Sequence, residues 1–358
     1  MLYREAGQFK TTYAADQQLF PIRQDRVAVL ALLAVAFLVV PFLANDYWFS
    51  AILIPFLVFA LAALGLNILT GYAGQLSLGS AAFMAVGAVA AYNFELRVPG
   101  LPLLASFALA GVCAAGVGVA FGLPSLRIKG FYLAVATLAA QFFIPWLLVK
   151  VGWFSNYSSS GVITAQPMEL LGYVFDSPAE KYVLVLAIVA LGALAAKNMV
   201  RSAVGRSWMA VRDMDVAAEV IGIPIMRTKL TAFAVSSFYC GVAGALYAYA
   251  YVGTVQPEDL NLELSFRILF MVIIGGVGSI LGSFLGAAFI TLLPILLDIV
   301  LTDATQLVGL QLEAGTVSMV QLLVFGGLII FFLIVEPHGL ARLWQIAKEK
   351  LRLWPFPY

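Results

Sequence analysis

Long apolar stretches alternate with short polar segments along almost the whole chain. A helix that crosses a bilayer needs about 20 predominantly apolar residues. The alternation therefore predicts an all-α integral membrane protein with about ten transmembrane helices. Glycine clusters interrupt the pattern in the third helix and in the eighth and ninth. The predicted spans are 27–44, 47–70, 77–94, 101–123, 130–150, 181–200, 229–252, 264–281, 283–301 and 316–335.

The composition agrees with this pattern. Hydrophobic residues make up 63% of the chain and charged residues 11%, with a mean hydropathy of +0.99. A soluble protein carries roughly 25% charged residues and cannot hide this much apolar surface from water. The bilayer is therefore the expected solvent of a transmembrane domain over 27–336. The polar ends, 1–26 and 337–358, are expected to be cytoplasmic tails.

Basic residues predict the orientation, because the cytoplasmic loops of membrane proteins collect Lys and Arg. If the N-terminus lies in the cytoplasm, ten spans place sixteen of the 20 basic residues inside. We therefore expect both termini to be cytoplasmic and residues 151–180 to form the longest outer loop. The basic residues left outside are Arg97, Lys150, Lys181 and Arg267.

Residues that carry catalysis or bind metals are scarce. The chain has two cysteines and one histidine, without ligand-like spacing, so we expect no catalytic residue and no metal site. A net charge of +1 gives no basic field for nucleic acid. A proton relay is poorly supported, since Asp298 lies near the outer end of its span.

The segment 201–229 carries most of the charge of the inner loops. Its spacing predicts a helix over about 208–221, which Gly222 and Pro224 would end. The expected apolar stripe is Val211, Met214, Ala218 and Ile221, and the expected charged face is Arg212, Asp215 and Glu219.

Three interpretations of this helix are open. It could lie on the membrane surface, insert into a groove of a cytoplasmic protein, or act as the regulatory loop of a channel. Surface helices favour Lys and Arg on the polar face, whereas this one has three acidic residues, Asp213, Asp215 and Glu219, against one base. The charge pattern therefore disfavours the first interpretation.

Two glycine-rich segments share a similar spacing: "GYAGQLSLGSAAF" (71–83) and "GGVGSILGSFLGAAF" (275–289). Their similarity suggests two related halves, as many transporters have. An interrupted membrane helix exposes backbone polar groups, which must face protein or a water-filled cavity. The clusters therefore either line a translocation path or pack helices closely. The candidate path residues are Gly71, Gly74, Gln75, Ser77, Gly79, Gly275, Gly276, Gly278 and Ser279.

The segment "GRSWMAVRDMDVAAEVIGI" (205–223) resembles the cytoplasmic loop with which ABC-importer permeases dock on their ATPases. Four further blocks resemble the branched-chain amino acid ABC transporter permease family, in the family's order and over most of the chain. They are "LNILTGYAGQLSLGSAAFMAVGA" (66–88), "LRIKGFYLAVATLA" (126–139), "LTAFAVSSFYCGVAGALYA" (230–248) and "IIGGVGSILGSFLGA" (273–287).

This resemblance implies a permease subunit of an ATP-driven importer in the bacterial plasma membrane. The expected partners are a second, homologous permease, two cytoplasmic ATPases and an outer solute-binding protein. The chain lacks the phosphate-binding motif G-x-x-x-x-G-K-[ST], so we expect no cofactor here and ATP use by the partner subunits. The implied coupling residues are Val211, Arg212, Asp213, Met214, Asp215, Ala218, Glu219, Ile221 and Gly222.

The implied cargo is a branched-chain or other hydrophobic amino acid, or a similar small polar solute. Two segments depart from the family: Gln141 stands where many members have Glu, and 156–167 lacks the usual outer-loop stretch. If either faces the cargo, the solute differs from Leu, Ile and Val. The alternative function is an ion- or proton-coupled secondary transporter, and a membrane-embedded enzyme ranks last.

Overall fold

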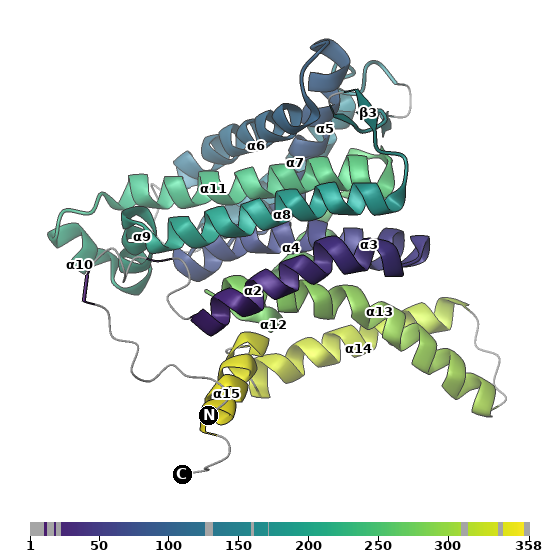
Figure 1. Ribbon diagram of the computed structural model, residues 1–358. Coiled ribbons are helices and arrows are strands. Elements are labelled where there is room, and N and C mark those ends of the chain that lie inside the picture. The colour runs from purple at the N-terminus through teal and green to yellow at the C-terminus, as the bar shows by residue number, and fades with distance from the viewer. Residues whose placement is uncertain are drawn as a thin grey trace.

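The computed structural model describes residues 11–12, 18, 23–125, 132–158, 161–170, 172–308, 314–335 and 339–353. Helices dominate these residues, and most of them run side by side as a bundle (Figure 1). The predicted all-α membrane architecture is confirmed.

The helices of the first half follow the predicted spans closely. They are α2 (Arg23–Ala34), π-helix η1 (Val35–Val39), α3 (Val40–Leu43), π-helix η2 (Trp48–Leu53), α4 (Ile54–Asn67), π-helix η3 (Ile68–Tyr72), α5 (Ser80–Arg97), α6 (Leu103–Ser125) and α7 (Tyr132–Lys150). The third span begins three residues later than predicted, because residues 73–79 are not helical.

The second half contains both long helices and short connecting helices. They are α8 (Pro178–Arg201), α9 (Ala203–Asp213), α10 (Asp215–Val220), α11 (Ile225–Leu246), π-helix η4 (Tyr247–Val252), 3-10 helix η5 (Pro257–Asp259), α12 (Leu262–Gly275), α13 (Ile280–Val308), α14 (Ala314–Val335) and α15 (Gly339–Leu353).

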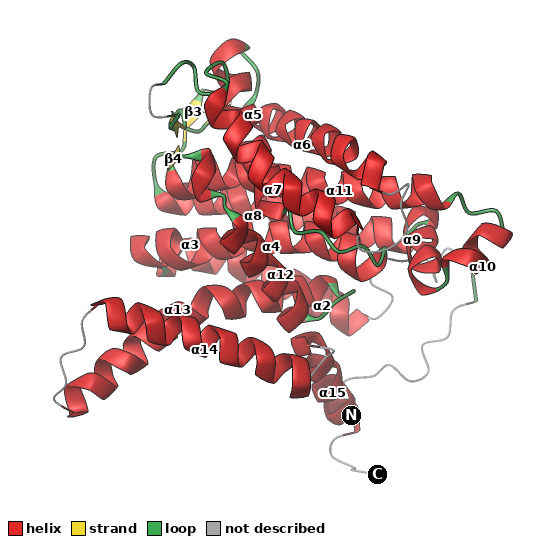
Figure 2. Cartoon of the chain, turned by 180° about the vertical axis from the view of Figure 1, so that it is seen from behind, coloured by secondary structure: helices red, strands yellow, loops and turns green. Residues whose placement is uncertain are grey.

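Four short strands lie at the end of the bundle opposite α9 and α10 (Figure 2). Strand β1 (Ile163–Thr164) pairs antiparallel with β4 (Thr254–Val255), with Ile163 opposite Val255. Strand β2 (Glu169–Leu170) pairs in the same way with β3 (Tyr173–Val174). The predicted outer loop 151–180 is therefore tied to the connection that follows η4.

Helix α4 forms the centre of the bundle. It is apolar on all sides, and most of the span Trp48–Tyr72 is buried. Around it, glycines allow close helix contacts: the Cα of Gly87 on α5 faces the backbone of Gly241 on α11, and Gly244 faces the backbone of Met84. A Cβ at either glycine would collide with a carbonyl, so these contacts depend on small residues.

Seven helices in the described part of the chain are long and apolar enough to cross a membrane. The predicted continuous span over 264–281 is wrong, because α12 ends at Gly275 and has 14 residues. Gly276 and Gly278 have φ angles of 123° and 78°, which a right-handed helix cannot contain. Helix α12 is thus about 21 Å long, less than a bilayer core of about 30 Å. The exact count of ten spans stays a prediction.

The C-terminal segment predicted as a tail contains the amphipathic helix α15. It packs against α12 and α13, and Lys348 forms an ion pair with Asp25 of α2 at 3.0 Å. At its start, Gly339 has a φ of 71° and lies against the backbone of Ile274 and Gly276. The chain after the last span is therefore attached to the break between α12 and α13.

Candidate functional site

The charged segment forms two helices, so the prediction of one helix over 208–221 is wrong. Helix α9 begins earlier, where the Ser202 hydroxyl accepts a hydrogen bond from the Val204 N–H at 3.2 Å. It ends at Asp213, because Met214 is extended, with φ −159° and ψ 90°. Helix α10 then begins at Asp215, a residue that favours the N-terminus of a helix.

Helix α9 is held firmly against the bundle. Trp208 is completely buried, and its indole N–H donates to the Thr231 hydroxyl of α11 at 3.1 Å. Val211, one turn further, is also buried. Gly205 lies against the backbone of Val200, so α9 turns sharply away from the end of α8. A displacement of α9 must therefore move α11 and α8 as well.

Helix α10 lies at one end of the bundle (Figure 1), and several of its apolar side chains are exposed. The predicted apolar stripe is split. Val211 and Ala218 face the protein, whereas Met214 and Ile221 are exposed. The reason is that the bend at Met214 rotates α10 relative to α9. We call α9 and α10 together the hairpin, and the large exposed apolar residues from its bend onward the tip surface. It consists of Met214, Val216, Val220 and Ile221.

The predicted end of the helix at Gly222 is confirmed. Gly222 has a φ of 88°, and its N–H donates to the Glu219 carbonyl at 3.0 Å. The next N–H, that of Ile223, donates to the Ala218 carbonyl at 2.9 Å. This is a Schellman closure, which favours glycine at the left-handed position. A Cβ at Gly222 would meet no atom within 4 Å, so only its backbone conformation disfavours other residues.

Arg212 connects the hairpin to the first glycine cluster. Its Nη1 donates to the Gly71 carbonyl at 2.7 Å, and its Nε pairs with Asp213 at 2.8 Å. The Cα of Gly74 also lies against the Arg212 side chain, where a Cβ would approach Cγ to 2.8 Å. The guanidinium is therefore turned toward the break after α4, whereas the Asp213 and Glu219 side chains point to solvent.

The two glycine clusters meet at Gly71 and Gly278. A Cβ at Gly71 would collide with the backbone of Gly278, so the chain must lack a side chain there. Asn67 of α4 is completely buried and bridges the same contact. Its Oδ1 accepts from the Gly278 N–H, and its Nδ2 donates to the Ser279 carbonyl and the Ser283 hydroxyl, each at 2.8 Å.

The first break is the non-helical segment 73–79 between η3 and α5. Side chains of α7 and α12 close its other side. The Gln141 Oε1 accepts from the Ala82 N–H at 2.9 Å and from the Ser265 hydroxyl at 2.8 Å. Its Nε2 donates to the Leu260 carbonyl at 2.9 Å. The Leu78 N–H donates to the Thr137 hydroxyl at 3.0 Å. These side chains cap the N-terminus of α5.

Gln141 is therefore engaged on both amide atoms and is 2% exposed. Its side chain joins α5, α7 and the segment around Leu260 and Ser265, and it does not face open space in this structure. Gln75 and Ser77 are also buried within the break. The Gln75 Nε2 donates to the Lys229 carbonyl at 3.3 Å, which ties the break to the start of α11.

Sequence reasoning missed Asn67, Trp208, Thr137 and Ser265. The available signals were a polar amide inside an apolar span and a tryptophan inside a polar loop. No group of three or more His, Cys, Asp or Glu in the described ranges has the arrangement of a metal site.

The structure thus joins an exposed, partly apolar hairpin to two interrupted helices of a membrane bundle. A family model described as "Branched-chain amino acid transport system / permease component" matches residues 48–333, which include the hairpin and both breaks. The chain belongs to this permease family. It is thus a multi-pass membrane protein and one component of a transport system.

Individual relatives agree with this assignment. The high-affinity branched-chain amino acid transport system permease protein LivM of Escherichia coli (strain K12) is 29% identical to this permease over 309 residues, covering 79% of this chain and 68% of the relative. The probable LivM of Methanocaldococcus jannaschii is 25% identical, covering 81% and 92%. An autoinducer 2 import system permease protein, LsrC of Enterobacter sp. (strain 638), is 28% identical, covering 51% and 59%.

These relatives are transport permeases and not enzymes, and they serve more than one kind of solute. No solved structure matches this permease.

Proposed function

We propose that this chain is the transmembrane permease subunit of an ATP-driven importer. Its cargo is a branched-chain or other hydrophobic amino acid, or a similar small polar solute. The observation that carries the coupling mechanism is the single side chain of Arg212, which joins the exposed hairpin to the break after α4. A movement imposed on the hairpin from the cytoplasm would reach the interrupted helices directly.

The tip surface supports docking on a soluble subunit. Exposed contiguous apolar residues mark protein contacts, and burying a Val, Ile or Met side chain contributes about 1.5–3 kcal/mol each. The exposed acidic groups of Asp213 and Glu219 flank this surface and would fix the orientation of a basic partner. Two ATPase subunits of the importer would provide such grooves, one for each permease.

The mechanism follows from how α9 is anchored. Since Trp208 and Val211 fix α9 to the bundle, closure of the ATPases would displace α9 and α10 together with the ends of α8 and α11. Arg212 would then displace Gly71 through their hydrogen bond. The contact of Gly71 with Gly278 would pass this displacement to the second break, between α12 and α13. The two breaks would act as one gate at the cytoplasmic end, with both chain termini on that side.

The remaining partners follow from the family. We propose a second, homologous permease across the two-fold axis, and a solute-binding protein that docks on the outer segment containing β1 to β4. The runner-up function, a secondary transporter, requires an intramembrane titratable relay. The hydrogen bonds at the breaks are made by neutral amides and hydroxyls, together with the permanently charged Arg212.

The test is to tag this chain, purify it gently from native membranes and identify the co-purifying proteins by mass spectrometry. We expect one or two ATPases and a second permease, and ATP-dependent uptake of radiolabelled leucine after reconstitution with the binding protein. A chain that purifies alone and moves solute in liposomes without ATP would establish the secondary transporter instead.

A further inference from the structure

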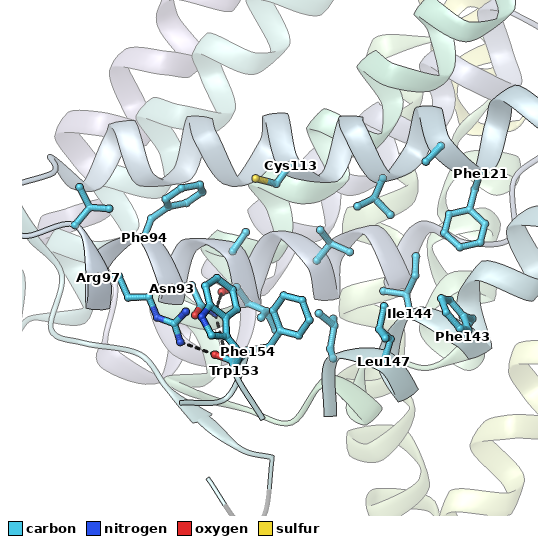
Figure 3. Close-up of a pocket in the computed structure, with 17 residues that line it drawn as sticks. Asn93, Phe94, Arg97, Cys113, Phe121, Phe143, Ile144, Leu147, Trp153 and Phe154 are labelled. Carbon is cyan, nitrogen blue, oxygen red and sulfur yellow. Dashed lines mark hydrogen bonds between the residues drawn. The ribbon is translucent and has the colours of Figure 1, made fainter. Parts of the chain in front are cut away.

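A cavity of 570 Å³ lies between α5, α6 and α7 (Figure 3), and none of its lining residues belongs to the hairpin or the glycine breaks. Its walls are almost entirely apolar. Along α6 it extends from Cys113 to Phe121, which is about 12 Å at 1.5 Å per residue. Phe143 and Leu147 of α7 form the facing wall. The cavity is therefore a long apolar slot.

Two polar residues, Asn93 and Arg97, lie at one end of the slot, where α5 ends beside the outer loop (Figure 3). The Arg97 guanidinium lies over the Trp153 ring, 3.6 Å from its centroid, and its Nη2 donates to the Trp153 carbonyl. The Arg97 Nη1 is buried and has no acceptor among the described residues. The same end thus holds a cation with an unused hydrogen-bond donor.

Asn93 lies one turn before Arg97 on the same face of α5. Its side chain is nine-tenths buried, and its Nδ2 donates to the carbonyls of Val89 and Phe154, both at 2.8 Å. Its Oδ1 is buried with no donor among the described residues. An unused acceptor therefore lies beside the unused donor, and leaving such groups unpaired costs about 1–3 kcal/mol each.

The charge at this end also lacks a counter-ion. No carboxylate in the described part of the chain lies within 4.0 Å of Arg97, whereas Arg212 and Lys348 each have one. A guanidinium suits recognition of phosphate, and tryptophan is enriched at membrane–water interfaces. An anionic head group would satisfy Arg97, and a hydroxyl or ammonium of the same head group would satisfy Asn93.

We propose that this slot binds one phospholipid of the outer leaflet. The phosphate lies on Arg97, and one acyl chain runs between α6 and α7 toward Phe121. Three residues at its rim, Val98, Phe143 and Trp153, are 45–47% exposed, so the slot opens to the surroundings of the bundle. The apolar length is far greater than an amino acid side chain needs, which favours a lipid over the transported solute.

The test uses the purified permease complex, delipidated in detergent and titrated with phosphatidylglycerol or phosphatidylethanolamine under native mass spectrometry. Arg97→Gln should weaken binding of one lipid about tenfold, as loss of a charge-assisted hydrogen bond implies. Lys150→Gln, a neutralised cation at the end of α7, is the matched control and should bind normally. Cys113→Phe should block the slot, whereas Val112→Phe, on an exposed face of α6, should not.

Thiol labelling of Cys113 provides a second readout, first on the wild-type chain. Cys240 is 1% exposed, so a maleimide added to the native complex reports Cys113. Adding phospholipid to the delipidated complex should slow this labelling, and Arg97→Lys should retain most of the protection.

Three results would overturn the proposal. The first is equal lipid binding by Arg97→Gln and the Lys150→Gln control. The second is displacement of the lipid by millimolar leucine, which would make the slot a cargo site. The third is labelling of Cys113 that ignores lipid and rises only when the second permease dissociates, which would make the slot a subunit contact.

Discussion

Replacing Arg212 separates docking from transmission, because its side chain faces Gly71 while the tip surface lies elsewhere on the hairpin. The bond between the Arg212 guanidinium and the Gly71 carbonyl, 2.7 Å long, is charge-assisted and part-buried. Such bonds contribute about 1.5–3 kcal/mol. At 1.4 kcal/mol per factor of ten, Arg212→Ala should reduce transport about 10- to 100-fold.

The assay is ATP hydrolysis and leucine uptake by the complex in the same proteoliposomes. We expect uptake per ATP hydrolysed to fall, with ATP hydrolysis and complex assembly close to wild type. Arg212→Lys keeps the charge and one donor. Its uptake per ATP hydrolysed should lie between that of the wild type and that of Arg212→Ala.

Arg206→Ala is the matched control, because Arg206 is on the same helix and, among the described residues, donates to the nearby Arg201 carbonyl at 2.9 Å. The uptake per ATP hydrolysed by this variant should equal that of the wild type. Unchanged uptake per ATP in Arg212→Ala would refute the transmission role, and so would an equal loss in Arg206→Ala.

Four further predictions test the parts of this connection. Glu219→Arg should weaken co-purification of the ATPase without lowering the melting temperature of the permease, because Glu219 is exposed beside the tip surface. Gly222→Val should uncouple transport through backbone strain of about 1–2 kcal/mol, while Gly222→Asn, which tolerates a positive φ, should retain most uptake. Asn67→Leu leaves the Gly278 N–H unpaired, so the free energy of unfolding should fall by about 1–3 kcal/mol, measured by denaturation in detergent. Trp208→Ala should cost about 3–5 kcal/mol by the same measurement and expose α9 to proteolysis; intact protease resistance would contradict the anchoring of α9.

The membrane fold was predictable because each span is a local property of the sequence. A run of apolar residues must satisfy its backbone within one helix, wherever the neighbouring helices lie. Predicted and observed helices therefore agree closely from α2 to α8. The disagreement at 264–281 arises because glycine inside an apolar run is compatible both with a continuous helix and with a break, and the φ values of Gly276 and Gly278 decide between them.

In the hairpin, too, the local sequence pattern predicted some features and not others. A charged helical segment that ends at Gly222 follows from the local pattern and was predicted, but its start at Ala203 was not. The turn at Met214 was not predicted, because nothing in the residue itself stops a helix. Burial of Trp208 and Val211 against α11 fixes one helix, and docking of Ala218 requires a different direction for the next.

The sequence alone thus determined that the chain is a helical membrane permease with a charged helical segment and two glycine-rich segments. Only the tertiary structure decided that these three features form one connected site. Arg212 lies 141 residues from Gly71, and Asn67 lies 211 residues from Gly278. Neither hydrogen bond leaves a periodic signal in one sequence, because each depends on which helices the packing of small residues brings together.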